Sequence, residues 1–71
     1  MEIGDKVRTN ELWNKHNDQI SSVIVGFDVL LSPKTKLLGD YYLFTGEYDH
    51  ISVVVLETGR KIREMYLVKV V

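Results

Sequence analysis

The chain has 71 residues, of which 45% are hydrophobic and 27% are charged, and its formal net charge is −1. This composition is typical of one small globular domain, excludes an intrinsically disordered chain and gives no bulk attraction to polyanions. There is no cysteine, so disulfides and thiolate zinc sites are excluded and a reducing, cytoplasmic setting is expected. No apolar run approaches the roughly 20 residues of a membrane helix, which predicts a soluble protein.

A first strand is predicted at residues 6–9, directly after the turn signal Gly4-Asp5. Polar and apolar residues alternate along it, so Val7 is expected to point inward while Lys6 and Arg8 face solvent. The polar segment 10–19 then predicts one long loop.

Within this long loop, Asn10 is placed to cap a single turn of helix, and only Leu12 and Trp13 are expected to be buried.

A second strand is predicted from Ile20 to Leu31. Its odd positions are all apolar and are expected to form the core face, and they are Val23, Val25, Phe27, Val29 and Leu31. Gly26 inside this run indicates a bulge or a sharp bend. The basic stretch 32–36 contains Pro33, which cannot donate a ladder hydrogen bond, and is therefore expected to be an exposed loop.

The remaining strands are separated by glycine turns. Gly39-Asp40 precedes a third strand, 41–45, which Gly46 is expected to end. The β-branched segment 51–56 predicts a central strand, and the Thr58-Gly59 turn returns the chain so that residues 60–63 pair back on it.

The last strand is predicted at residues 67–71, after a corner at Met65-Tyr66, and should close against the first strand. These elements predict an all-β fold, a small five-stranded and mostly antiparallel barrel. No internal repeat or linker interrupts the chain, so residues 1–71 are expected to form a single domain.

The two ends of the chain carry a family resemblance. The opening Gly4-Asp5-Lys6-Val7 and the closing Gly59-Arg60 with Tyr66–Val70 resemble the ends of a Src-homology-3-like barrel, and the start is similar to KOW-type barrels. The only tryptophan, Trp13, lies too early for proline-rich peptide recognition. No glycine follows until Gly26, which departs from the KOW pattern and weakens a ribosomal or nucleic-acid role.

Exposed aromatic residues predict a protein-binding face. Consecutive Tyr41 and Tyr42 point to opposite faces of a strand, so a one-sided sheet cannot bury both. Acidic neighbours favour a protein partner or a second copy over nucleic acid. The alternative is that large rings cap the core of a small barrel. The predicted face comprises Trp13, Tyr41, Tyr42, Phe44, Tyr48, Asp40, Glu47 and Asp49.

A basic patch is the second candidate site, because the first and last strands are neighbours in such a barrel. It would bind acidic partners or, weakly, RNA or DNA. The alternative is that these cations serve solubility and protect sheet edges. The patch comprises Lys6, Arg8, Arg60, Lys61, Arg63 and Lys69.

The sequence contains no recognisable catalytic or metal-binding motif. His16 near Asp18, and His50 near Glu47 and Asp49, have no zinc spacing, and no serine lies in a nucleophile motif. We therefore expect no metal, no cofactor, no small-molecule substrate and no enzymatic activity. The sequence predicts a small accessory or regulatory binding module, of the kind that phages and mobile elements encode.

Overall fold

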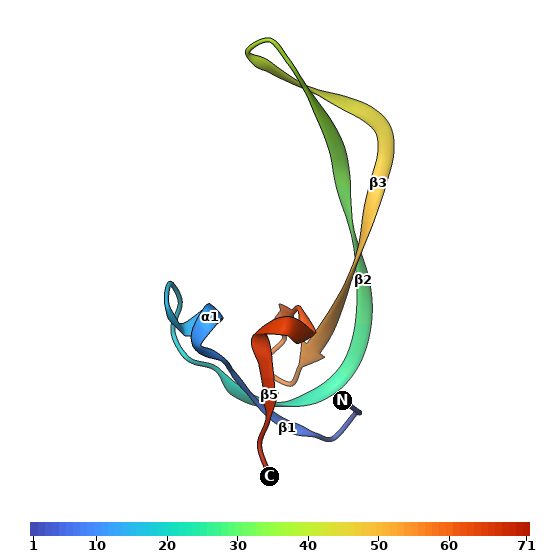
Figure 1. The fold of residues 1–71 in the computed structure, drawn as a ribbon. Helices are drawn as coiled ribbons and strands as arrows, with labels where there is room; N and C mark the ends of the chain where they lie inside the picture. The colour runs from blue at the N-terminus through green and yellow to red at the C-terminus, as the bar shows by residue number, and fades with distance from the viewer.

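Two long strands dominate the structure, a computed structural model that describes all 71 residues (Figure 1). In chain order the elements are β1 (Lys6–Thr9), α1 (Glu11–Asn14), β2 (Ser21–Leu38), β3 (Tyr41–Leu56), β4 (Lys61–Ile62), the 3-10 helix η1 (Glu64–Tyr66) and β5 (Leu67–Lys69). The outer parts of β2 and β3, residues 27–52, form a hairpin that we call the arm. The rest of the chain is the base.

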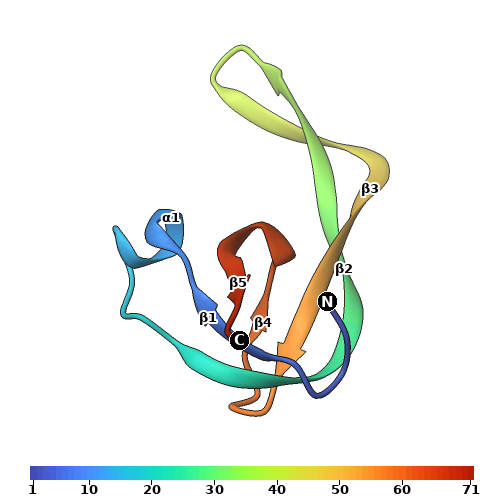
Figure 2. The same ribbon diagram turned by 60° about the horizontal axis from the view of Figure 1, so that its bottom comes forward.

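The five strands form one antiparallel sheet in the order β4-β3-β2-β1-β5. The predicted return of the last strand to the first is confirmed by the pairing of β5 with β1, and the predicted hairpin by the pairing of β4 with β3. The sheet curls in the base (Figure 2), but no strand pairing joins β4 to β5. The all-β prediction is confirmed, whereas the closed barrel is not observed.

The core is small and lies entirely in the base. Its six buried side chains come from all five strands, and they are Val7, Ile24, Val54, Leu56, Ile62 and Leu67. Trp13, Ile20 and Tyr66 pack against them while half-buried. The inward orientation of Val7 is confirmed, but the predicted burial of Leu12 is wrong, because its side chain is 62% exposed.

A bulge beside Gly26 explains why the core face of β2 differs from the prediction. Ile24 pairs with Leu56 and Gly26 with Val55, so Val25 is an extra residue in the ladder. Because of this extra residue, the positions of β2 that point inward change from even numbers, as at Ile24, to odd numbers after the bulge. There, however, the base ends, and the side chains predicted as core are exposed; these are Val25, Phe27, Val29 and Leu31.

Polar side chains join the segment after β1 to the rest of the base. The predicted cap is confirmed, since the side chain of Asn10 accepts a hydrogen bond from the backbone N–H of Trp13 and also donates to the Met65 carbonyl at 2.7 Å. The buried Thr9 hydroxyl donates to Asn14 at 2.6 Å and accepts from the Ile20 N–H. These bonds fix the predicted long loop against β1 and η1.

The arm projects away from the base as a lone two-stranded ribbon. No residue of 27–52 is buried, and the molecule measures 49 × 24 × 16 Å. Its radius of gyration is 15.3 Å, against about 11 Å for a compact domain of this length. The predicted loop at residues 32–36 and the predicted strand end at Gly46 are both wrong, because β2 and β3 run through these positions.

The confinement of the core to the base predicts a sharp contrast in mutational cost. Leu56→Ala should lower the free energy of unfolding by about 2 to 5 kcal/mol, because it leaves a cavity. Leu38→Ala, at the exposed tip of the arm, should change it by less than about 0.5 kcal/mol. Urea unfolding, followed by Trp13 fluorescence at low protein concentration, measures both. Equal losses would show that the arm packs against the base in solution.

Candidate functional site

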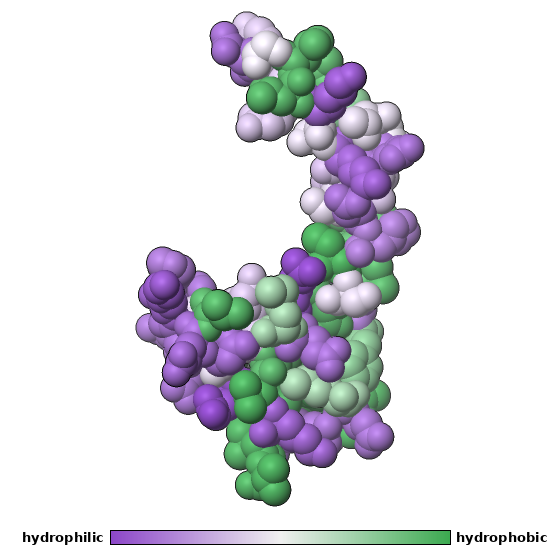
Figure 3. Space-filling model, in the orientation of Figure 1, coloured by the Kyte–Doolittle hydropathy of each residue, from purple (hydrophilic) through white to green (hydrophobic).

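The tip of the arm concentrates large apolar side chains on both faces of the ribbon. Its ladder runs from the Thr35–Phe44 pair to the Leu38–Tyr41 pair, closed by Gly39 with φ of +60°. Tyr41 and Tyr42 are 76% and 73% exposed, so the expectation of an exposed ring is confirmed for both. The tip also exposes Leu37, Leu38, Leu43 and Phe44. Figure 3 shows this apolar cluster separated from the base by more polar residues.

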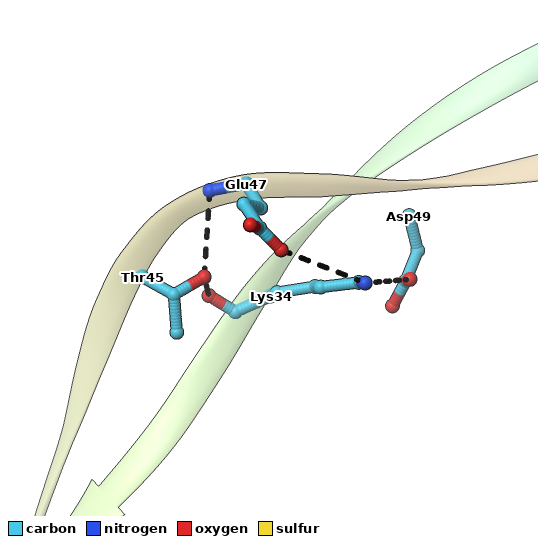
Figure 4. A network of polar contacts seen from close by, with 4 residues as sticks. All are labelled: Lys34, Thr45, Glu47 and Asp49. Carbon is cyan, nitrogen blue, oxygen red and sulfur yellow. Dashed lines mark hydrogen bonds and ion pairs between the residues drawn. The ribbon is translucent and has the colours of Figure 1, made fainter.

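A large bulge separates the tip from the lower arm. The ladder passes from Pro33–Tyr48 to Thr35–Phe44, so three residues of β3 lie opposite Lys34 alone. Gly46 has φ of +88° at this point. The Lys34 ammonium bridges the carboxylates of Glu47 and Asp49 at 3.8 and 3.5 Å (Figure 4). This contact lies at the bend and neutralises part of the acidic charge.

The structure brings together seven of the eight residues predicted for the protein-binding face. Tyr41, Tyr42, Phe44 and Asp40 lie at the tip; Glu47, Tyr48 and Asp49 lie at the bulge. The rings of Phe44 and Tyr48 join the two groups, with centroids 5.2 Å apart.

Trp13 does not belong to this cluster. Its ring lies in the base, edge-on to Tyr66 at 5.8 Å, and its indole N–H donates to the Asp18 carbonyl.

Three tip leucines were missing from the predicted face, namely Leu37, Leu38 and Leu43. The available signal was their position beside the Gly39-Asp40 turn, since residues that flank a hairpin turn outside a core are exposed on both faces.

The predicted basic residues do not form one patch. Lys6 and Arg8 share the outward face of β1, whereas Lys69 pairs with Val7 in the ladder and therefore lies on the opposite face. Lys69 contacts Asp5 at 3.6 Å, and Lys61 contacts Asp28 at 2.7 Å. Two of the six cations are thus matched by carboxylates.

Arg60 and Arg63 flank β4 and make no ion pair. Arg60 lines an open polar pocket of about 530 Å³ together with Asn14, Lys15, His16, Asn17, Asp18 and Ile20. His50 lies far along the arm, opposite Leu31, so the two histidines are on different parts of the molecule.

A narrower, mostly apolar groove lies on the outward face of β1. It has a volume of about 230 Å³ and is lined by Lys6, Val7, Ser21, Ser22, Val23 and Val70. Lys6 pairs with Val23 in the ladder, and its carbonyl accepts a hydrogen bond from Val70. Arg8 lies two residues along the same face, and neither Lys6 nor Arg8 makes an ion pair.

Two carboxylates, those of Asp5 and Asp28, have a pKa that their surroundings lower. The Lys61 ammonium, with help from the Val29 N–H, lowers the pKa of Asp28 below its ordinary value. The pKa of Asp5 is lowered by the backbone N–H of Glu2 and by Lys69. Asp28 lies at the root of the arm and Lys61 on β4, so their ion pair fastens the arm to the base.

Comparison of the chain with family models, curated proteins and solved structures gave no match. No helix of the structure is long and apolar enough to cross a membrane.

The Asp28–Lys61 pair predicts a pH-dependent effect of Asp28→Asn. The folded pKa of Asp28 lies below 3.8, so the pair stabilises the fold above about pH 4 and this contribution is lost as pH falls through the folded pKa. The melting temperature of Asp28→Asn should lie below that of the unmodified chain at pH 7, and the gap should close towards pH 2. The gap is expected to be small and to shrink in high salt, because both side chains are partly exposed.

Thermal melts followed by circular dichroism across this pH range measure the gap. Glu57→Gln, which alters an exposed acid without an ion pair, is the matched control and should show no such trend. A gap of equal size at pH 2 and pH 7 would contradict this role of the pair.

Proposed function

We propose that this protein is a non-enzymatic binding module that docks a protein partner through the tip of its arm. The observation that carries the proposal is the exposure of Tyr41, Tyr42 and Phe44 on a ribbon that packs against nothing else in the chain. Aromatic rings are the side chains most enriched at the centres of protein interfaces.

The size of the exposed apolar surface supports this proposal. At 150–250 Å² for a whole aromatic side chain, the exposed parts of Tyr41, Tyr42, Phe44 and Tyr48 amount to about 500 Å². The tip leucines add to this area. These rings are divided between the two faces of the ribbon, and large exposed apolar surface on a soluble protein marks an interaction site.

The geometry of a lone ribbon also favours a partner. A two-stranded hairpin is marginally stable in water unless a third strand or another surface covers one of its faces. Both strands of the arm have a free backbone edge, and such edges are templates for further pairing. A protein partner can cover the apolar face and satisfy these edges together.

Nucleic-acid binding is supported less well. Lys61 and Lys69 are paired with carboxylates, and the remaining cations are spread over different faces of the base. The arm carries four acidic residues, Asp28, Asp40, Glu47 and Asp49, against two lysines, Lys34 and Lys36, so its net negative charge disfavours phosphates.

The base provides the platform for the arm. Its strand order, with β5 returned to β1, supports a Src-homology-3-like architecture in which the β2–β3 connection is extended into the arm. The size of the domain and its lack of cysteine fit a small accessory or regulatory protein in a reducing, cytoplasmic setting. In this proposal the base holds and orients the arm, and the arm makes the contact.

Site-specific photo-crosslinking in the native cell tests the proposal. A benzophenone amino acid at Tyr42 should form an adduct with a protein, whose added mass and peptide sequence identify it. The same probe at Met65, an exposed residue of η1 in the base, is the control and should not form this adduct. Adducts with nucleic acid, or equal protein adducts from both positions, would overturn the proposal.

A further inference from the structure

We propose that the protein seated on the arm is a second copy of this chain. The two arms lie antiparallel about a two-fold axis, so that the tip of each arm docks on the outward face of β1 of the other copy. This inference rests on the proposed function, because it names the partner of the same tip.

The first argument is area. A stable interface buries about 800 Å² on each partner. Over both faces of the ribbon the four aromatic rings of the arm offer about 500 Å², and the leucines of the tip with the exposed Phe27, Val29 and Leu31 of the lower arm extend it further. In a two-fold dimer each copy contributes both an arm and a receiving base, so the contact between arm and base occurs twice and the total buried area is doubled.

The second argument is the groove on the outward face of β1. Its apolar walls lie on either side of Lys6: Val23 belongs to β2 and Val70 directly follows β5. Nothing in the same chain fills the groove. One aromatic ring of a partner's tip is the kind of side chain that a small apolar groove accepts.

The third argument is charge. Asp40, at the end of the tip, makes no ion pair, and neither do Lys6 and Arg8 beside the groove. A tip that docks in the groove brings Asp40 towards these two cations. A dimer with parallel arms would place the two Asp40 carboxylates together instead, which favours the antiparallel arrangement.

Two-fold symmetry gives this proposal a sharp test by charge exchange. In the variant Asp40→Lys, both tip contacts of the homodimer become repulsive. The same holds for the double variant Lys6→Glu with Arg8→Glu. In a mixed dimer of the two variants, however, one contact joins Lys at the tip to Glu at the groove, and the other joins the native Asp40 to the native cations. Both contacts of the mixed dimer are therefore complementary.

Sedimentation equilibrium over a range of protein concentrations measures the outcome. The unmodified chain should reach twice its 8.2 kDa mass. Each charge variant alone should dimerise at least 10-fold more weakly, and the equimolar mixture should recover a dissociation constant within about 3-fold of the original. Recovery on mixing also shows that both variants are folded.

Two controls complete the experiment. The double variant Arg60→Glu with Arg63→Glu reverses two cations that do not line the groove. It should still form a dimer, and mixing it with Asp40→Lys should not restore the affinity that Asp40→Lys has lost. Ile3→Thr removes an exposed apolar side chain of the base and should leave the dimer intact. Tyr41→Thr with Tyr42→Thr should weaken the dimer at least 10-fold.

An unmodified chain that stays monomeric at millimolar concentration would overturn the dimer. So would a mixture that associates no more tightly than its components. The crosslinks distinguish the two proposals. An adduct at Tyr42 with a different protein would keep the docking role of the tip but overturn the second copy as its partner. The absence of any protein adduct at Tyr42 would overturn the proposed function itself.

Discussion

The continuous β2–β3 ladder is the constraint on which the rest of the structure depends. Near its base end the Ile24–Leu56 pair lies in the core, and at its outer end the ladder closes at Gly39-Asp40, far from any other element. A few buried side chains therefore position a long exposed ribbon. The bulge at Val25 sets which face of the ribbon continues the core, and the ion pair of Asp28 with Lys61 holds its root against β4.

The sequence correctly indicates where the ladder of the arm is disturbed, but β2 and β3 continue through these positions. Pro33 and Gly46 predict a loop and a strand end; in the structure Pro33 lies directly before one bulge and Gly46 lies within it. Every strand of a two-stranded ribbon is an edge strand, so a proline without an N–H is tolerated there. Local signals report where a ladder is disturbed, whereas only the pairing of β2 with β3 across the disturbance decides whether the strand ends.

The predictions succeeded where neighbouring residues alone decide the outcome. The cap at Asn10, the turns at Gly39 and Gly59, and the alternation around Val7 are local, and all are confirmed. The residues that share a patch depend on long-range register instead. Adjacency of β1 and β5 was predicted correctly, but the pairing of Val7 with Lys69 separates that lysine from Lys6.

The same distinction explains the predicted aromatic face. Tyr41 and Tyr42 could be placed on opposite faces from their spacing alone. The position of Trp13 depends on Tyr66, at the other end of the chain, whose ring it meets edge-on. An aromatic residue in a polar loop is indistinguishable from a surface ring until the element that covers it is known.

The exposure of the arm limits the strength of any complex that it forms. A ribbon with no buried residue gains little from packing within its own chain, so part of the free energy of binding is used to order its backbone and side chains. Area alone then overstates the affinity. At the bulge the exposed Lys34 contacts Glu47 and Asp49, and surface ion pairs of this kind offset the cost only slightly. A partner that contacts the tip and the lower arm at once gains most, since it covers both sides of the bend.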